Sequence, residues 1–350
     1  MALKIALMPS RYNRADLLEA AGFETYEAPA RSPEELIDVL QDADAALVTT
    51  RPLTTRAVLE ACPKLKVVSR MGVGVDSIDL PAATEQGICV CNVPGVNTVE
   101  VADHAVALLL AVTRQLSEAI TATREGQWSD PARVSHLQRS VRRIAGHTVG
   151  IVGFGNIGRA FARRIEGFGP ARIIAADPYV DQSTADLYGV QLVSLDTLAS
   201  EADFISIHSS ATDETHHLVD GDIFAKMNSG TVVVNCARGS IIDQQALLIA
   251  LREGQIGGAA IDVAEVEPIE SDNPLLQEPN CLVTPHVAGF SPTFLDECPR
   301  KQAENVINIL TGNRPHGLAN PEVIKTIAVM RSGDPGRWQG IPDFSTALDL

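Results

Sequence analysis

Short apolar runs with the composition of buried strands alternate with helix-period stretches along most of this sequence. Strands that alternate with helices pair in parallel, and the helices cover both faces of the sheet. A chain of 350 residues is also longer than one typical core, so two domains are expected. The pattern therefore predicts an α/β fold with two doubly wound parallel-sheet domains. The expected strands include Lys4–Met8, Ala45–Thr49, Lys66–Arg70, Ile88–Asn92, Thr148–Val152, Arg172–Ala176, Phe204–His208, Thr231–Asn235, Ala259–Val263 and Cys281–Thr284.

Two turn-rich segments mark candidate domain boundaries. Asn92–Thr98 precedes a long helical stretch, and Pro285–Pro292 follows the last expected strand. The simplest architecture inserts a cofactor-binding domain of residues 100–288 into a smaller domain built from residues 1–99 and 289–330. Residues 331–350 show no clear periodicity and are expected to form a mobile or surface-wrapping C-terminal tail.

Composition and charge argue against several classes of function. The formal net charge is −16, so the surface repels phosphate backbones and anionic lipid, and neither nucleic acid nor membrane is an expected partner. No apolar run is long enough to span a bilayer, and the N-terminal residues read as a buried strand and not as a signal peptide. The six cysteines form no CxxC pair and no metal-ligand spacing with histidines. This usage predicts a cytoplasmic setting and no metal site.

A glycine-rich turn between a strand and a helix is the strongest local signal. Gly153, Gly155 and Gly158 form a G-x-G-x-x-G pattern after the strand Thr148–Val152. In a dinucleotide-binding turn, the first glycine allows the tight turn and the second lets the backbone approach the pyrophosphate. The third lets helix and strand pack closely. The sequence therefore predicts a Rossmann domain that binds a dinucleotide.

The residues around this turn indicate which dinucleotide is bound. Free N–H groups near Asn156 and Ile157 are expected to receive the phosphates at the positive end of the helix dipole. Asp177 ends the next strand, about 20 positions after the third glycine, where an acid accepts hydrogen bonds from ribose hydroxyls. A carboxylate there would repel a 2′-phosphate, so NAD is the predicted cofactor and NADP is disfavoured.

Three polar residues follow later strands, at the sheet edge where ligands of open α/β sheets bind. They are Arg238, Glu267 and His286. An arginine can hold a carboxylate through its bidentate fork, a histidine can donate a proton, and a glutamate can orient that histidine. Each residue alone also has an ordinary structural reading, as a salt bridge, a surface carboxylate or a turn cap. Together, and downstream of the glycine turn, they favour carbonyl reduction of a small 2-keto acid.

The motifs together resemble the D-isomer-specific 2-hydroxyacid dehydrogenase family, which includes phosphoglycerate, glyoxylate and hydroxypyruvate members. The resemblance implies an NAD-dependent enzyme acting on a CH–OH group, with a Rossmann domain inserted into a split flavodoxin-like substrate domain. It runs from about residue 40 to residue 321 and is carried by Arg70–Asp79, Asn92–Thr98, Val101–Leu110, Gly126–Trp128, the glycine turn, Asn235–Asp243, Ala260–Pro268, Thr284–Gly289 and Gly312–Pro321.

The resemblance implies roles for individual residues. Arg238, Glu267 and His286 would be catalytic. Asp262 would contact the nicotinamide carboxamide, and the other cofactor neighbours would be Ser209, Cys236 and Ala237. Besides Arg238, the substrate would contact Val73, Gly74 and Asn97. No comparable role falls on four histidines, which are expected to be packing or surface residues: His104, His208, His216 and His217.

Two alternative functions remain open, and the chain departs from the family pattern in places. Formate dehydrogenases share the architecture but place Gln where Glu267 stands, so Glu267 argues for ketone chemistry. A corepressor-like protein that senses NAD(H) would keep the fold and the cofactor, but it would not need the complete catalytic set. Ser209–Ala211 replaces a usual proline, and Val141–Ile144 replaces a usual Gly-x-Glu-Leu. Phe290 stands where small residues are usual and could narrow the substrate pocket.

The substrate itself is not fixed by these motifs. Arg70 is expected to face the substrate just before the turn at Gly72, and a second cation would suit a 2-keto acid with a second anionic or polar end. Alternatively, Arg70 pairs with Asp76 or Asp79 and the pocket takes a neutral tail.

The stretch Val101–Val112 is apolar on nearly every side, more than one domain face buries. With the resemblance, it predicts a homodimer paired through the cofactor domain. The alternative is that this helix fills the space between domains.

Overall fold

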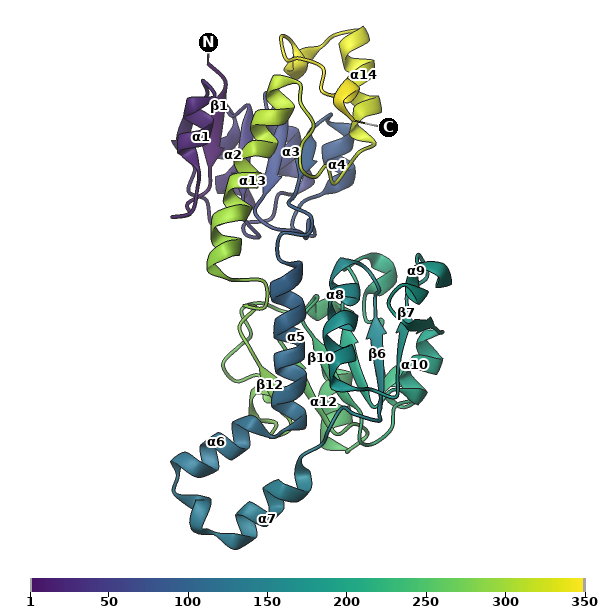
Figure 1. The fold of residues 1–350 in the computed structure, drawn as a ribbon. Coiled ribbons are helices and arrows are strands. Elements are labelled where there is room, and N and C mark those ends of the chain that lie inside the picture. The colour runs from purple at the N-terminus through teal and green to yellow at the C-terminus, as the bar shows by residue number, and fades with distance from the viewer. Residues whose placement is uncertain (1, 349–350) are drawn as a thin grey trace. The chain divides into compact units, whose positions relative to one another are not determined.

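The computed structural model describes residues 2–348 and divides the chain into two compact units. Unit 1 comprises Met1–Asn97 and Ser291–Leu350, and unit 2 comprises Thr98–Phe290. Each unit contains one parallel sheet with helices on both of its faces (Figure 1). The predicted α/β class with two doubly wound parallel sheets is therefore confirmed.

The sheet of unit 1 has the strand order β2-β1-β3-β4-β5, which is the flavodoxin order with its switch point beside β1. Its inner strands are buried on both faces, as the apolar runs predict. Its strands are β1 (Lys4–Leu7), β2 (Glu24–Glu27), β3 (Ala45–Val48), β4 (Val67–Arg70) and β5 (Cys89–Cys91). Its helices are α1 (Ala15–Ala20), α2 (Pro33–Leu40), α3 (Arg56–Ala61), α4 (Leu80–Glu85), α13 (Pro292–Thr311) and α14 (Val323–Ser332).

The sheet of unit 2 has the order β12-β11-β10-β9-β6-β7-β8, which contains the Rossmann arrangement and adds β12 at one edge. Two apolar clusters lie on its two faces. Its strands are β6 (Thr148–Val152), β7 (Arg172–Ala176), β8 (Val190–Leu192), β9 (Phe204–Ile207), β10 (Val232–Asn235), β11 (Gly258–Ile261) and β12 (Cys281–Val283). Its helices are α5 (Thr98–Thr113), α6 (Leu116–Arg124), α7 (Pro131–Ser140), α8 (Asn156–Ile165), α9 (Gln182–Asp186), α10 (Leu195–Glu201), α11 (Gly221–Phe224) and α12 (Gln244–Arg252).

The long helical stretch at the start of unit 2 is broken into two helices. Gln115 adopts a left-handed conformation with φ of 53°, so α5 ends at Thr113 and α6 continues at an angle of 61°. Within residues 2–348, no single helix is long and apolar enough to cross a bilayer, although this bent pair passes on length and composition. The apolar side of α5 packs on α8 and the sheet of unit 2.

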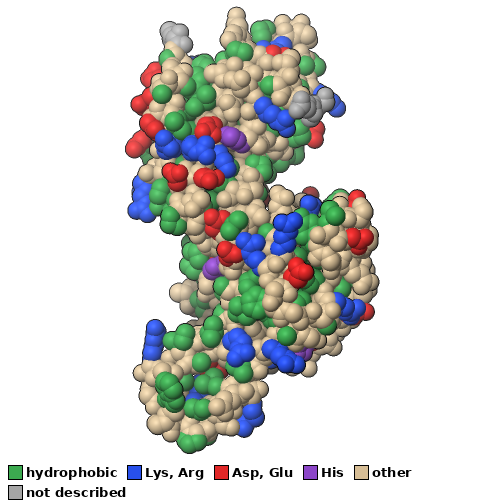
Figure 2. All heavy atoms as spheres, viewed as in Figure 1, with side chains coloured by type: hydrophobic (Ala, Val, Ile, Leu, Met, Phe, Trp, Pro, Cys, Tyr) green, Lys and Arg blue, Asp and Glu red, His purple; other side chains and the backbone are tan. Residues whose placement is uncertain are grey.

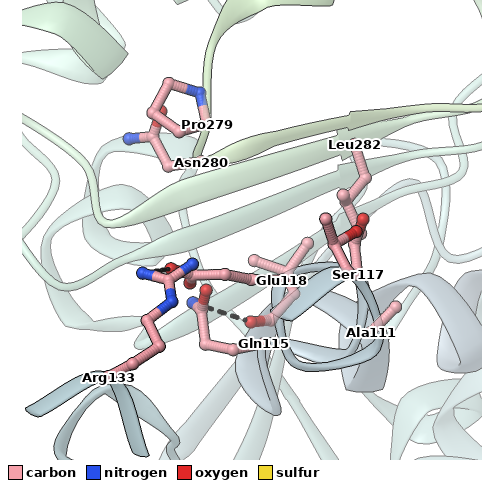
Figure 3. A pocket seen from close by; sticks show the side chains of 10 residues that line it. Ala111, Gln115, Ser117, Glu118, Arg133, Pro279, Asn280 and Leu282 are labelled. Carbon is pink, nitrogen blue, oxygen red and sulfur yellow. Dashed lines mark hydrogen bonds and ion pairs between the residues drawn. The ribbon is translucent and has the colours of Figure 1, made fainter. Parts of the chain in front are cut away.

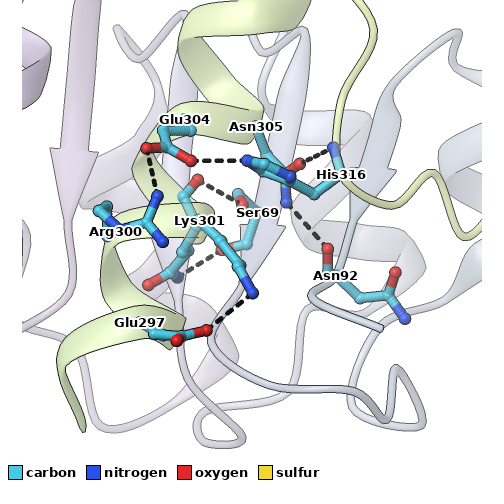
Figure 4. Close-up of polar contacts among 9 residues, drawn as sticks. Ser69, Asn92, Glu297, Arg300, Lys301, Glu304, Asn305 and His316 are labelled. Carbon is cyan, nitrogen blue, oxygen red and sulfur yellow. Dashed lines mark hydrogen bonds and ion pairs between the residues drawn. The ribbon is translucent and has the colours of Figure 1, made fainter. Parts of the chain in front are cut away.

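Helix α13 belongs to unit 1 although unit 2 separates it in sequence from the strands it covers. The side-chain amide of the buried Gln302 donates to the backbone carbonyls of Val48 and Ser69, at 3.1 and 2.7 Å. The backbone carbonyl of Gln302 accepts the Ser69 hydroxyl at 2.9 Å. The buried Asn305 donates to Asn92 O at 2.9 Å (Figure 4). Ion pairs line the outer side of the helix, such as Lys301–Glu297 and Arg300–Glu304. Polar groups buried in the interface thus fix how the two segments join.

The segment expected to form a tail is anchored in the core of unit 1. Trp338 is only 1% exposed, and its indole N–H donates to Gly87 O at 2.8 Å. Phe344 is also buried and packs near the Trp338 ring. Arg331 donates to the Ile341 carbonyl and holds the segment across α14. These contacts make residues 331–348 part of the unit.

Candidate active site

The glycine turn of unit 2 has a separate geometric reason for each glycine. Gly153 has φ of +87°, and a Cβ there would lie 2.5 Å from the backbone of Ser209. A Cβ on Gly158 would collide with the Gly153 carbonyl, so helix α8 packs directly on the turn. A Cβ on Gly155 would meet nothing within 4 Å. Gly155 therefore borders open space, where a ligand can approach the backbone.

The start of helix α8 offers an anion site beside this opening. Asn156 and Ile157 form its first turn, and the preceding Gly155 provides no side-chain cap for the free N–H groups. Because free N–H groups and the helix dipole both favour negative charge, the turn fits a pyrophosphate. The residues present thus fit a dinucleotide.

Asp177 lies at the end of β7, beside the glycine turn. Its Oδ2 accepts the Phe154 N–H at 2.7 Å and its Oδ1 accepts the Tyr179 N–H at 2.9 Å. These bonds hold the carboxylate at the edge of the opening. The position suits an acceptor for ribose hydroxyls.

The residues after β9 and β10 follow strands that lie on one side of β6 in the sheet, and the backbone of Ser209 lies against Gly153. The Ser209 hydroxyl is buried and has no hydrogen-bond partner among the described residues, as expected for a group kept for a ligand. Burial lowers the pKa of the neighbouring His208 to about 3, so its ring is neutral. Cys236 and Ala237 are buried after β10.

Asn235, which the sequence interpretation missed, shapes the turn that presents Arg238. Its side-chain amide donates to Arg238 O and its oxygen accepts the Ala237 N–H, both at 2.9 Å. The Arg238 guanidinium donates to Ala237 O at 2.8 Å. An asparagine at the end of a strand is a common turn residue, so the sequence contained a weak signal for it.

His286 and Glu267 form a hydrogen-bonded pair, with His286 Nδ1 2.7 Å from Glu267 Oε2. Partial burial opposes ionisation of Glu267. The hydrogen bond and charge of His286, the Ala264 N–H and the charge of Arg238 together outweigh it and lower the Glu267 pKa. Glu267 is therefore a carboxylate within the electrostatic reach of Arg238. The structure thus brings the three predicted catalytic residues together in unit 2.

The buried carboxylate of Asp262 organises the turn that carries His286. It is 1% exposed and accepts three hydrogen bonds, from Thr284 Oγ1 at 2.6 Å, Val287 N at 3.0 Å and Ala288 N at 2.8 Å. The Asp262 carbonyl also accepts the His286 N–H at 2.8 Å. His286 itself has φ of 52°, an uncommon left-handed conformation. Asp262 therefore has an internal positioning role besides any contact with a cofactor.

His104, expected to be a packing or surface residue, lies beside this network. Its Nε2 is 3.3 Å from Thr284 Oγ1 and 3.6 Å from Asp262 Oδ1. Because His104 comes from α5 and its neighbours follow β11 and β12, only the folded chain reveals the proximity.

The remaining predicted residues lie in unit 1, after β4 and β5. Arg70 is 9% exposed, and its guanidinium lies where a Cβ on Gly72 would be. The carbonyl of Val73 accepts the side-chain amide of Asn92 at 2.7 Å, which fixes the loop that contains Gly74. Asn97 Oδ1 is buried and has no hydrogen-bond partner within residues 2–348. These residues and the catalytic residues of unit 2 belong to separate units.

Comparisons with known proteins place this architecture in one family. Residues 106–288 match the model for the NAD binding domain of D-isomer specific 2-hydroxyacid dehydrogenases. A glyoxylate reductase from Korarchaeum cryptofilum is 40% identical, and the match covers 85% of this chain and 89% of that protein. A D-3-phosphoglycerate dehydrogenase from Methanocaldococcus jannaschii is 37% identical over 89% of this chain, which spans only 58% of that protein.

Among solved structures, an NAD-dependent formate dehydrogenase from Staphylococcus aureus in complex with NAD has a TM-score of 0.76 and 32% identity. The match covers 88% of this chain and 94% of the formate dehydrogenase chain. The chain belongs to the D-isomer specific 2-hydroxyacid dehydrogenase family. It is an NAD-dependent oxidoreductase that acts on the CH–OH group of a 2-hydroxy acid.

Proposed function

We propose that this enzyme interconverts a small 2-keto acid and its D-2-hydroxy acid, with His286 as the acid/base group. The observation that carries the proposal is the 2.7 Å contact between His286 Nδ1 and Glu267 Oε2, with the charge of Arg238 acting on the same carboxylate. NADH supplies the hydride to C2 of the keto acid when it is bound.

The protein's own groups then account for the remaining chemistry. Arg238 binds the substrate carboxylate through its guanidinium. As the C2 carbonyl becomes an alkoxide, the ring nitrogen Nε2 of protonated His286 donates the proton that completes the hydroxyl group. Glu267 holds the other ring nitrogen and stabilises the charged imidazole. In the oxidation direction, neutral His286 accepts the hydroxyl proton.

Kinetics of His286→Ala test this assignment directly. Its kcat for NADH oxidation should fall about 10²–10⁴-fold if general acid catalysis is its role. Glu267→Gln should also lower kcat, but by a smaller factor than His286→Ala. A matched control is His147→Gln, because His147 precedes β6 at the opposite edge of the sheet and pairs with Asp203. A His286→Ala variant with normal kcat would remove this residue from the mechanism.

Two assays separate the alternative functions. NAD reduction with formate tests formate oxidation, which an ionised Glu267 beside His286 disfavours. NADH binding without turnover on glyoxylate, hydroxypyruvate, phosphohydroxypyruvate and 2-ketoglutarate would instead indicate a corepressor-like sensor. The low exposure of Arg70, at 9%, favours a substrate without a second charged end.

We propose that the chain forms a homodimer. Helix α5 does not supply the interface, because its apolar side is buried within unit 2. The support comes from the arm formed by α6, the turn Gln127–Ser129 and α7, which extends from the body of unit 2 (Figure 1). Hydrophobic side chains gather on this arm (Figure 2). They include Leu116, Ile120 and Trp128, of which Trp128 is 76% exposed.

A cavity of about 220 Å³ lies at the base of the arm, between the helices and the strand β12 (Figure 3). The Arg133–Glu118 ion pair, at 2.8 Å, lies at its polar side. We assign the cavity and the arm to contact with a second copy of the chain. Light scattering should report a dimer for the unaltered protein and a monomer for the double variant that combines Ile120→Asp with Trp128→Ala. A monomer in both cases would refute the assignment.

We also propose a cytoplasmic location. All six cysteines are buried as free thiols, and thiols without disulfides fit a reducing compartment. Cell fractionation with an antibody to the chain tests this.

A further inference from the structure

Two adjacent histidines and a glutamate meet on unit 2 outside the residues assigned to catalysis. His216 and His217 follow the short turn Asp213–Thr215 after β9, and Glu265 lies in the loop after β11. Their ligand-type atoms all lie within 4.8 Å of one another. Both loops leave the carboxyl edge of the sheet, so the group links two loops that only folding brings together.

The backbone at His217 places both imidazole rings together. His217 has φ of 50°, a left-handed conformation that is unfavourable for a residue with a Cβ. In an extended chain neighbouring side chains point to opposite sides. Here the two ring centroids are 4.0 Å apart and the rings are inclined by 30°. The His217 N–H donates to Ser240 O at 2.8 Å and holds this turn.

Glu265 is held opposite the rings from its own loop. Its Oε1 lies 2.5 Å from His217 Nε2. Gly239 packs directly against the backbone of Ala264, where a Cβ would have no room. The Glu265 N–H also donates to the Gln244 side chain at 3.4 Å. The loop therefore presents the carboxylate to both histidines.

We propose that His216, His217 and Glu265 bind one divalent metal ion of the zinc class. Two imidazoles and a carboxylate are a zinc ligand set, with bonds of about 2.0–2.2 Å and thus ligand atoms about 3.3 Å apart in a tetrahedron. The present separations extend from 2.5 Å, between His217 and Glu265, to at most 4.8 Å. Rotation of the exposed His216 and Glu265 side chains closes this difference. Imidazole ligands disfavour Mg²⁺ and Ca²⁺, which take oxygen ligands.

The site has two further properties. The metal would take the place of the hydrogen shared by His217 and Glu265, so binding requires neutral imidazoles. Three protein ligands leave the fourth coordination position to water. The chain's net charge of −16 raises the local concentration of cations. No metal site was expected from the sequence, because the cysteines form no CxxC pair and no metal-ligand spacing with histidines. Adjacent histidines and a glutamate 48 positions from His217 also match no ligand-spacing motif.

Isothermal titration of the full chain with ZnCl₂ tests the proposal. One ion per chain should bind, and MgCl₂ should give no comparable heat. His216→Ala and Glu265→Gln should each weaken Zn²⁺ binding by at least about tenfold, because removing a direct ligand costs no less than removing a supporting residue. His136→Ala is the matched control, since His136 is an exposed histidine of the same unit. Circular dichroism of each variant verifies folding.

His286→Ala distinguishes this site from the catalytic pair, which also combines a histidine and a glutamate. Zn²⁺ affinity should be unchanged in that variant. Affinity lost in His286→Ala, or retained in both His216→Ala and Glu265→Gln, would overturn the proposal. Several weak sites of equal affinity would also overturn it, because they would indicate adventitious binding to the acidic surface.

Discussion

Replacing Asp262 with asparagine tests how the turn that carries His286 is held. The carboxylate accepts the Thr284 hydroxyl and the Val287 N–H on Oδ1, and the Ala288 N–H on Oδ2. An asparagine can keep its oxygen toward the first two donors. Its NH₂ group then faces the Ala288 N–H, and two buried donors oppose each other.

The expected cost follows from these three contacts. Hydrogen bonds to a charged group are worth about 1.5–3 kcal/mol each and those to a neutral group about 1 kcal/mol, while an unsatisfied buried donor costs about 1–3 kcal/mol. Two weakened bonds and one lost bond therefore destabilise unit 2 by about 3 kcal/mol or more. For a unit of this size, that lowers Tm by roughly 6–12 °C. Thr284→Val, which removes one donor to the carboxylate, should lower stability by about 1.5–3 kcal/mol.

Calorimetry and kinetics of Asp262→Asn separate its two possible roles. If Asp262 positions the turn, Tm and kcat should fall while the Kd for NADH changes little. If it serves mainly as a contact to the nicotinamide carboxamide, the Kd for NADH should rise and Tm should stay near that of the unaltered protein. The second pattern would refute the positioning argument drawn from the three hydrogen bonds.

Three other substitutions have defined outcomes. Asp177→Ala should narrow the preference for NADH over NADPH in kcat/KM, because it removes the charge that repels a 2′-phosphate; an unchanged ratio would count against this role. Arg70→Ala should affect glyoxylate and phosphohydroxypyruvate turnover alike if the buried guanidinium supports only its own loop. A selective loss with the phosphorylated substrate would show that it reads a second charge. Trp338→Ala should destabilise unit 1 by about 3–5 kcal/mol. The control Val329→Ala changes a side chain on α14 that is 72% exposed, and should alter the free energy of unfolding by no more than about 0.5 kcal/mol. Equal effects of the two substitutions on urea unfolding would contradict the anchoring of residues 331–348.

Buried strands were predictable from the sequence because both of their faces are covered, which leaves a continuous apolar run. The strands β2 and β8 were absent from the expected set, and each is an edge strand of its sheet. β2 reads Glu-Thr-Tyr-Glu, without the apolar run that marks an inner strand. The break at Gln115 was also missed, since the residues on both sides of it have helical periodicity.

The glycine turn and the order Arg238, Glu267, His286 were recognisable because each follows a strand, and strand ends share one edge of a parallel sheet. Contacts that join side chains from distant elements left no such pattern. His104 on α5 lies beside Asp262 only after α5 packs on the sheet, and Trp338 reaches Gly87 across most of the sequence of the chain. Their partners are set by tertiary packing, which local periodicity does not encode.

The discontinuous construction of unit 1 imposes an order on folding during synthesis. A ribosome that has released β1 to β5 has not yet made Gln302 and Asn305, which satisfy backbone carbonyls at the ends of β3 and β4 and at Asn92. Unit 2 is contiguous and can complete its sheet first. The first five strands must therefore wait, with one sheet face covered only in part by α1, until α13 and Trp338 emerge. Premature termination after unit 2 would leave a chain exposed to aggregation.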